Sequence, residues 1–549
     1  MKLNGEVSYL LDDALSQAIQ NGVTVLNGIS DEKLTLVAAD TSGDDFHRTA
    51  TKHPRETVLR SKRFQLRPAR DVKKMLDGLA PLQFSRRQAS PLQKLCEAGS
   101  EYGVRILEKT VSSELLSLLR PKAKRRLKDG LRQILARVTR LCLALEFDAF
   151  RCAHQAIHPQ RLSLTPKLIE KKFLGERPYD RLISLFNKFP VLAELWSQLI
   201  CYWGDSVSDL LARIEADKQE LSRVFFRGQP IAEIVDLRGA LSDPHNKGRT
   251  VMRVQFQVGS IIYKPRSGDG EREWFNLVGY LNAASYQPKL SAARVLCRND
   301  YCWMEDVKAT PCTDTVAARR FYKRLGGMIA AAYLVRAVDC HRDNLIASGE
   351  HPVLVDAETL WHVDSKKKAR RLLDVLYATG FFPTSARRSS YEYRSSALGR
   401  TRPGKHTAYI NSEPLHAGQY ESEIVDGFCK AWRCLLSTTG RRAVFGRRLQ
   451  RLRDRKRRRI YSSTRAYDAI MQASIQPAAL RSGIDRNLLI ARSCTRPGVP
   501  QKIIREETNA LKRLDIPYFI SRASGGSPFP ENNAGPAEIT EALRRALRR

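Results

Sequence analysis

The chain lacks the short patterns that identify several common classes of enzyme and binding protein. Among its 549 residues, the eleven cysteines form no CxxC pair, and the ten histidines and the cysteines show no zinc-ligand spacing. No GxSxG nucleophile elbow is present, and no GxGxxG phosphate loop precedes the hairpin described below. A zinc site and a serine hydrolase are therefore not expected. Dispersed cysteines in a long chain are typical of reduced thiols in the cytoplasm.

Long apolar segments are also absent. The first residues run into the acidic pair Asp12-Asp13 without the apolar stretch of a signal peptide. The longest apolar run, Met328–Val335, is too short to cross a bilayer. We therefore expect a cytoplasmic protein without a membrane span.

Acidic residues are outnumbered by basic ones. The chain has 58 Asp and Glu against 93 Lys and Arg, which gives a formal net charge of +35. This excess favours an acidic or polyanionic partner, and the alternative is a basic composition spread over solvated surfaces. Nucleic acid is not expected as the partner, because no helix-turn-helix, zinc-finger or RNP pattern is present.

The organisation along the chain predicts an α+β protein. The hydrophobic share of 42% and the length suit two or three domains. Residues 1–90 are weakly patterned, with a polar loop at Asp40–Arg63, and residues 91–225 are expected to form a helical region. A helix of this region restarts at Phe189-Pro190. Another carries an apolar face made by Leu131, Ile134, Leu135, Val138, Leu141 and Leu145.

Residues 226–530 are expected to form the core, a small β-rich lobe followed by a helical lobe. Alternating apolar and polar residues predict a hairpin with strands at Met252–Gln257 and Ile261–Lys264 around the turn Val258–Ser260. Residues 531–549 are expected to be a mobile tail. The other expected elements are helices at Trp274–Leu281 and Phe321–Val338, a strand at His351–Asp356, a Gly/Pro/Asn-rich stretch at Ser524–Pro536 and a short helix after Ala537.

Polar residues of this core follow the order of parts that ATP-dependent phosphotransfer uses. The set is Lys264, Asp339, Asn344, Asp356 and Glu358. Phosphotransfer needs a strand lysine for the phosphates, an aspartate that orients the accepting hydroxyl, and oxygen ligands for Mg²⁺. The short Asp339–Asn344 spacing and the later aspartate match protein kinases, although the residues that usually flank them in kinase motifs are missing.

Each of these residues also has a structural alternative. Lys264 could be a structural residue at a strand end, and Asp339 and Asn344 could cap the flanking helices. Asp356 and Glu358 lie on one face just past a strand, where two neighbouring carboxylates would cost free energy unless they bind a cation. The structural alternative is that both are exposed loop acids. The order of the whole set favours the phosphotransfer hypothesis.

Two further segments allow several interpretations. Asp243 and His245, in the stretch Ser242–Arg249, could be metal ligands, a general acid–base pair or parts of a turn, and the turn is favoured. Arg458 and Thr464 lie in the strongly basic stretch Arg441–Arg465, for which a solvated face is the default interpretation.

At these residues the chain resembles the dehydratase part of class II lanthipeptide synthetases, the LanM family, over roughly residues 90–525. The long stretch Asp339–Leu360 is the most specific match. The other matching stretches are Ser242–Gly248 with Ile262–Ser267, Arg458–Tyr467 and Leu514–Phe519.

The resemblance implies a lipid-kinase-like bilobal core with an added helical N-terminal region, using ATP and Mg²⁺. Such an enzyme phosphorylates Ser and Thr in a ribosomal precursor peptide with a leader and a Ser/Thr-rich core. It then eliminates phosphate to leave dehydroalanine or dehydrobutyrine. The resemblance implies a role in the phosphorylation step for Lys264, Asp339, His341, Asn344, Asp356 and Glu358, of which the last three bind the metal. It implies a role in the elimination step for Asp243, His245, Arg458 and Thr464, and Lys264 serves both steps.

The chain also departs from the family pattern. It stops at Arg549 without a Cys/His zinc set after Tyr518, so thioether cyclisation is expected to be absent or to need a separate cyclase. Ser462 stands where the family often has an arginine. Family leaders are commonly acidic, and the arginines of 447–459 would attract them. A peptide kinase without elimination and an inactive peptide-binding scaffold for a separate cyclase remain as rival hypotheses.

Overall fold

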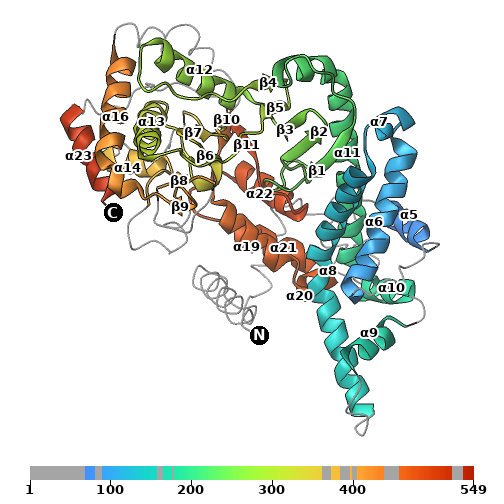
Figure 1. Ribbon diagram of the computed structural model, residues 1–549. Coiled ribbons are helices and arrows are strands. Elements are labelled where there is room, and N and C mark those ends of the chain that lie inside the picture. Colours follow the sequence, from blue (N-terminus) through green and yellow to red (C-terminus); the bar gives the residue numbers. More distant parts are fainter. Residues whose placement is uncertain are drawn as a thin grey trace. The chain divides into compact units, whose positions relative to one another are not determined.

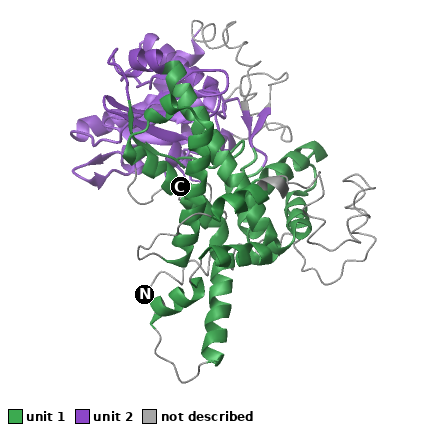
Figure 2. Ribbon diagram, turned by 90° about the vertical axis from the view of Figure 1, so that its right-hand side faces the viewer, with its two compact units in different colours: residues 1–217, 233–250, 462–517 green, residues 218–232, 251–461, 518–549 purple. Residues whose placement is uncertain are grey.

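The computed structural model describes residues 69–80, 90–157, 165–175, 178–361, 372–383, 396–398, 405–437, 457–521 and 536–548 (Figure 1). The described chain is mixed α+β and mostly helical. It divides into two compact units, each built from separate stretches of sequence (Figure 2). The predictions for Asp40–Arg63, for most of the basic stretch 441–465 and for 524–535 concern residues outside the described part.

Unit 1 consists of residues 1–217, 233–250 and 462–517. Its first helices are α5 (Ala69–Leu79), α6 (Pro91–Thr110), α7 (Ser113–Ser117), α8 (Pro121–Ile157), α9 (Pro166–Leu174), α10 (Pro178–Lys188) and α11 (Pro190–Phe225), the last turns of which belong to unit 2. It also contains strand β1 (Ile234–Arg238) and helices α19 (Thr464–Ser474), α20 (Pro477–Arg481), α21 (Gly483–Cys494) and α22 (Gln501–Lys512).

The sequence signals for helices in unit 1 are confirmed. α6 begins at a capping box in which Ser90 and Gln93 satisfy each other's backbone N–H groups. The break at Phe189 separates α10 from α11, and Pro190 occupies the first turn as expected. The apolar face of α8 is narrower than predicted, because Ile134 and Leu145 are 39% and 43% exposed while Leu131, Leu135 and Val138 are buried.

Unit 2 consists of residues 218–232, 251–461 and 518–549, and its main sheet carries Lys264. Four of its strands, all antiparallel, run in the order β2 (Met252–Phe256), β3 (Gly259–Lys264), β5 (Cys302–Glu305) and β4 (Val295–Cys297). The predicted hairpin is confirmed. Phe256 pairs with Gly259, so β3 begins within the predicted turn, and Lys264 pairs with Cys302 on β5.

The rest of unit 2 is helical, with short hairpins. The helices are α12 (Asp269–Ala283), α13 (Thr315–Leu334), α14 (Leu372–Ala378), α16 (Glu421–Leu436) and α23 (Pro536–Leu547), with the 3-10 turns η1 (Arg342–Asn344) and η2 (Ala417–Tyr420). The short strand pairs are β6 (Leu345–Ser348) with β7 (His351–Leu354), β8 (Tyr409–Ile410) with β9 (Glu413–Pro414), and β10 (Arg457–Arg459) with β11 (Phe519–Ser521).

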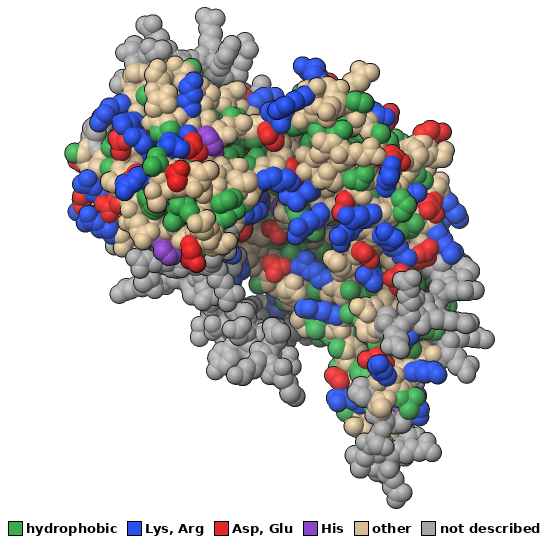
Figure 3. All heavy atoms as spheres, viewed as in Figure 1, with side chains coloured by type: hydrophobic (Ala, Val, Ile, Leu, Met, Phe, Trp, Pro, Cys, Tyr) green, Lys and Arg blue, Asp and Glu red, His purple; other side chains and the backbone are tan. Residues whose placement is uncertain are grey.

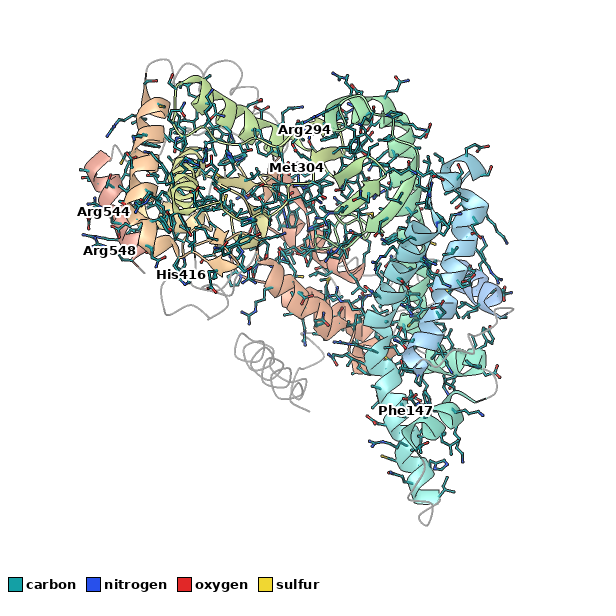
Figure 4. The ribbon with its side chains drawn as sticks, viewed as in Figure 1. Phe147, Arg294, Met304, His416, Arg544 and Arg548 are labelled. Carbon is teal, nitrogen blue, oxygen red and sulfur yellow. The ribbon has the colours of Figure 1, made fainter. Side chains whose placement is uncertain are left out.

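Helices α13 and α16 form the centre of this unit. A Cβ at Gly326 would lie 2.0 Å from the Ile424 carbonyl oxygen, and one at Gly427 would lie 1.9 Å from that of Lys323. Only glycine at both positions lets the two backbones approach this closely. α23, predicted after Ala537, docks on the same layer through Arg544 and Arg548, which pair with Glu421 of α16 (Figure 4).

The predicted ends of two helices in unit 2 were wrong. α12 begins at Asp269, five residues before Trp274, because the acidic residues of its first turn do not show the apolar periodicity used to find it. α13 begins at Thr315 rather than Phe321 and ends at Leu334 rather than Val338. The chain takes a positive φ of 44° at Arg336, and the Val338 N–H then donates to the Thr359 carbonyl instead of continuing the helix. The bilobal, lipid-kinase-like arrangement stays a prediction.

Candidate active site

Ionisable side chains gather in the interior of unit 2, and we call this group the ion-pair cluster. Its members are Lys264 at the end of β3, Arg266 just after it, Glu271 in the first turn of α12, Asp356 and Glu358 after β7, and Arg458 in β10. Their side-chain exposures range from 0% for Glu271 to 25% for Asp356. Charges at such depth are tolerated only when they are paired and hydrogen-bonded.

Lys264 is fixed by two acceptors. Its Nζ donates to Glu271 Oε1 at 2.7 Å and to the Val355 carbonyl oxygen at 2.5 Å, and lies 3.9 Å from Asp356 Oδ2. Burial alone would lower the pKa of Lys264, but Asp356 and Glu271 outweigh burial and raise that pKa. An ammonium has three N–H donors, so the described contacts leave one for a further acceptor such as a phosphate oxygen.

Arg266 contacts carboxylates on three residues. Its Nη1 donates to Glu271 Oε2 at 3.0 Å and to the Ser267 carbonyl at 3.1 Å. Its Nη2 donates to Glu271 Oε1 at 2.6 Å and to Asp356 Oδ1 at 2.7 Å, while Nε faces Glu358 Oε2 at 2.8 Å. A guanidinium has five N–H donors, and four of them donate to these acceptors, while Nε forms an ion pair with Glu358 without a hydrogen bond. Arg266 therefore organises carboxylates, and its contacts with the described residues occupy four of its five N–H donors.

The first turn of α12 is packed directly against the loop that follows β7. A Cβ at Gly270 would lie 2.3 Å from the Ala357 carbonyl oxygen, so this approach requires glycine. The contact places the fully buried Glu271 between Lys264 and Arg266. Burial would raise the pKa of Glu271, but Arg266 and Lys264 lower it, so the carboxylate stays charged.

Glu358 collects three donors at the other side of the cluster. Arg458 Nη1 donates to Oε1, and the Tyr518 hydroxyl donates to Oε2 at 3.0 Å, beside Arg266. The Arg458 guanidinium also lies over the Tyr518 ring, 5.3 Å from its centroid. Burial would raise the pKa of Glu358, but Arg266 and Arg458 together lower it to about 2. The pairing of β10 with β11 brings Arg458 and Tyr518 together.

The segment from Asp339 to Asn344 forms a tight loop between α13 and β6. Asp339 has a φ of +67°, a conformation that a non-glycine residue adopts only when its surroundings hold it. Asn344 Nδ2 donates to the Asp339 carbonyl oxygen at 2.9 Å, and the Cys340 N–H donates to the Thr379 carbonyl at 2.7 Å. The loop is therefore preorganised by its own side chains and by a neighbouring segment.

His341 holds a defined tautomer in this loop. The Asp343 backbone N–H, which can only donate, lies 3.2 Å from His341 Nδ1. In the neutral ring the proton therefore sits on Nε2, which faces Asp339 Oδ1 at 3.3 Å. Burial raises the pKa of the Asp339 carboxyl, while His341 and Arg458 oppose that rise. The His341 ring therefore lies against the Asp339 carboxylate.

The residues near this loop suit a Mg²⁺–ATP ligand. Asn344 Oδ1 accepts no hydrogen bond from the described residues, and Asp356 Oδ2 has only the Lys264 ammonium at 3.9 Å nearby. Both are hard oxygen ligands of the kind that Mg²⁺ prefers. The oxygens of Glu358 are occupied by protein donors. No group of three or more His, Cys, Asp and Glu residues placed to hold a metal occurs among the described residues, so a metal here would need ligand oxygens from phosphate.

The remaining predicted site residues belong to unit 1. Asp243 is exposed, and His245 is half-buried with its Nδ1 2.8 Å from the Ile516 carbonyl oxygen. Thr464 is the exposed first residue of α19, and the preceding Ser463 caps that helix by accepting the Ala466 N–H. Their roles stay predictions, as do those of the unit 2 residues.

Four residues with defined contacts had been given no role by sequence reasoning, namely Arg266, Glu271, Tyr518 and Asp515. Arg266, Tyr518 and Asp515 lie inside stretches that match the LanM family, so the family resemblance could have identified them. Glu271 had no such signal, because its importance depends on a contact with Lys264 that only the fold creates.

None of the described helices combines the length and the apolar character that a membrane span needs. The described cysteines include all eleven of the chain, and no disulfide joins them.

Comparison with known proteins yields two matches. A family model described as a domain of unknown function, DUF4135, matches residues 189–410 and 400–522. The chain is also similar to the lacticin 481/lactococcin biosynthesis protein LcnDR2 of Lactococcus lactis subsp. lactis, with 22% identity over 382 residues. That alignment covers 61% of this chain and 41% of the relative, so the chain spans about two fifths of the relative's length. The two matches confirm the resemblance to class II lanthipeptide synthetases.

Proposed function

The chain belongs to the DUF4135 family, and from that membership and the geometry of unit 2 we propose that it is an ATP-dependent peptide dehydratase of lanthipeptide biosynthesis. Its substrate is a ribosomal precursor peptide, in which it phosphorylates Ser or Thr and then eliminates the phosphate. The observation that supports the proposal is the ion-pair cluster, where the hydrogen bonds to described residues leave N–H donors on Lys264 and Arg458 but occupy four of the five N–H donors of Arg266.

For phosphorylation, Asp339 orients the Ser or Thr hydroxyl and accepts its proton, and His341 Nε2–H holds the carboxylate. When bound, ATP supplies the phosphoryl group and Mg²⁺ spreads its negative charge. Asn344 and Asp356 offer oxygen ligands to the metal, and the remaining N–H of Lys264 contacts phosphate. We reassign Glu358 from metal ligand to anchor of Arg458, since its oxygens already accept from protein donors.

For elimination, a base takes the Cα proton of the phosphorylated residue. The electron pair forms the Cα=Cβ bond, the Cβ–O bond breaks, and phosphate leaves with that electron pair. Arg458 contacts Glu358 and the Tyr518 ring, and in this proposal it holds the departing phosphate with its other N–H groups. Asp243, His245 and Thr464 take part in this step.

The direct test is intact-mass spectrometry of a Ser/Thr-rich precursor peptide after incubation with the protein, ATP and Mg²⁺. We expect loss of water units with the wild type and no change with Lys264→Ala. Lys308→Ala is the matched control, because Lys308 is a 56% exposed lysine of the same unit. Dehydration that persists in Lys264→Ala would contradict the assignment.

The same experiment separates the rivals. Arg458→Lys keeps the charge but loses the guanidinium fork, and it should accumulate phosphorylated peptide. Phosphate adducts as the end product of the wild type would instead favour a kinase without elimination. An unchanged mass with a peptide that binds would favour an inactive scaffold for a separate cyclase.

A further inference from the structure

The loop that carries His245 in unit 1 has an unusual backbone. Asn246, Lys247 and Gly248 have consecutive φ values of 47°, 70° and 73°, and two of these residues are not glycine. Left-handed conformations at consecutive non-glycine residues are unfavourable and persist only where other contacts enforce them. The same geometry turns the successive backbone N–H groups toward one side, which creates a small anion-binding concavity.

The side chain of Asp515 fills this concavity. Its Oδ2 accepts the Lys247 N–H and its Oδ1 accepts the Gly248 N–H, each at 2.7 Å. Asp515 is 1% exposed, and the only guanidinium near it among the described residues is that of Arg513, with Nε 3.6 Å from Oδ2. A buried carboxylate depends on such donors, and the loop depends on the carboxylate to keep its conformation.

The next residue of the same segment fixes the ring of His245. The Ile516 N–H donates to the Pro244 carbonyl at 2.8 Å, and the Ile516 carbonyl oxygen lies 2.8 Å from His245 Nδ1. A carbonyl oxygen can only accept, so Nδ1 carries the proton and the neutral ring has its lone pair on Nε2. His341 of unit 2 has the opposite tautomer, since its Nδ1 accepts a backbone N–H.

We propose that Asp515 is a positioning residue for phosphate elimination, which holds the strained loop so that His245 presents Nε2 as a proton acceptor. The inference rests on the proposed dehydratase function and adds to it a residue and a tautomer. Asp515 touches no substrate in this account, and it acts only through the Lys247 and Gly248 N–H groups. Phosphorylation, which depends on residues of unit 2, does not require it.

The test uses the isosteric variant Asp515→Asn in the full chain. An amide offers one oxygen and one NH₂, so one of the two backbone N–H groups loses its acceptor. The substrates are the precursor peptide with ATP and Mg²⁺, and separately a synthetic phosphoserine form of that peptide. Asp468→Asn is the matched control, since Asp468 is a 49% exposed aspartate of the same unit.

We expect Asp515→Asn to lower elimination from the phosphopeptide at least tenfold while ADP formation stays within twofold of the wild type. Phosphorylated peptide would then accumulate, and Asp468→Asn would behave as the wild type. Equal elimination by Asp515→Asn and wild type overturns the inference. Equal losses of elimination and ADP formation also overturn it, because they indicate a structural role alone. A wild type that cannot eliminate phosphate from the phosphopeptide refutes the proposed function instead.

A second readout does not depend on activity. The ¹⁵N chemical shifts of His245, assigned by comparison with His245→Asn, distinguish a protonated Nδ1 from a protonated Nε2. We expect the Nδ1–H tautomer in the wild type and a mixed population in Asp515→Asn. A wild-type ring that carries its proton on Nε2 would overturn the inference irrespective of turnover.

Discussion

At the scale of the residue, Glu358 is the side chain on which most of the candidate site depends. It is 10% exposed, and it joins Arg266, Arg458 and the Tyr518 hydroxyl. Removing its charge leaves two buried guanidinium groups without their shared partner. Loss of one member of a buried ion pair is much more costly than loss of the whole pair.

We therefore predict that Glu358→Gln lowers the free energy of unfolding at pH 7 by about 3–5 kcal/mol. Glu421→Gln, which removes a 27% exposed partner of Arg544 and Arg548, should cost less than about 1 kcal/mol. Urea denaturation of both variants measures the difference. Equal midpoints for the two would show that Glu358 is not a structural anchor.

The pKa of Glu358 gives this prediction a pH dependence. Its pKa falls from 4.5 to about 2 on folding, so its contribution is fully present above pH 4.5. It is lost as the pH falls through the folded-state pKa. The difference between wild type and Glu358→Gln should therefore shrink between pH 4.5 and pH 2.

Glu194 of α11 should show the opposite behaviour. It is 6% exposed, and burial raises its pKa from 4.5 to about 7 although Arg486 opposes the rise. Between pH 4.5 and about pH 7, the Glu194 carboxyl is protonated in the folded state but ionised in the unfolded state. Stability is thus highest below pH 4.5 and declines until pH 7, by about 3 kcal/mol in total.

We predict that Glu194→Gln removes this decline and makes unit 1 more stable than the wild type at pH 7. The measurement is the denaturation midpoint as a function of pH, followed by a probe in unit 1. A variant that retains the wild-type slope between pH 4.5 and 7 would contradict the assignment. The effect has the opposite sign to that of Glu358, which makes the two variants controls for each other.

The residues of the candidate site divide according to what a sequence can reveal. Lys264, Asp339 and Asn344 became candidates because their order along the chain matches a known chemistry, and their roles stay predictions. Glu271 was missed, because nothing in the residues between it and Lys264 indicates that the two side chains meet. The expectation that Asp356 and Glu358 are either metal ligands or exposed acids also overlooked the arginines that hold them.

At the scale of the element, the alternation and periodicity of apolar residues predicted the strands and helices that local sequence determines. The hairpin of β2 and β3 was found because Met252, Val254 and Phe256 alternate with polar residues, and these three are buried. Helix ends were less accurate because they depend on contacts from elsewhere. The end of α13 is set by the bond from Val338 to Thr359, and these two residues lie on opposite sides of the β6–β7 hairpin.

The pairing of β10 with β11 is the clearest element that sequence could not supply. Arg458 pairs in register with Ile520, and the strand between Arg457 and Arg459 had been read only as part of a basic stretch. The partner strand, β11, lies about sixty residues later in the sequence, at Phe519–Ser521. The family resemblance had implied both Arg458 and Glu358 for one enzyme, but only this pairing shows that Arg458 contacts Tyr518 and Glu358.

At the scale of the whole molecule, the dominant property is the net charge of +35. Figure 3 shows Lys and Arg side chains distributed over the visible face, with fewer Asp and Glu among them. Such a surface attracts acidic peptides over a distance that salt shortens, from about 10 Å at 0.1 M to about 3 Å at 1 M. The leader of the precursor peptide is the proposed acidic partner.

We predict that the affinity for an acidic leader peptide falls at least tenfold when the salt concentration rises from low to high, because screening removes the attraction. Fluorescence anisotropy titrations over a salt series measure it. A leader with its acidic residues replaced by amides serves as the control and should bind weakly at every salt concentration. A dissociation constant that does not change with salt would show that charge plays no part in recognition.

The most direct test of the central claim is a time-resolved intact-mass measurement of the precursor peptide with wild-type protein, ATP and Mg²⁺. We predict that a phosphorylated peptide appears first and decays into the dehydrated peptide, with phosphate released in equal amount. A peptide that is never phosphorylated, or one that is dehydrated without ATP, would contradict the account.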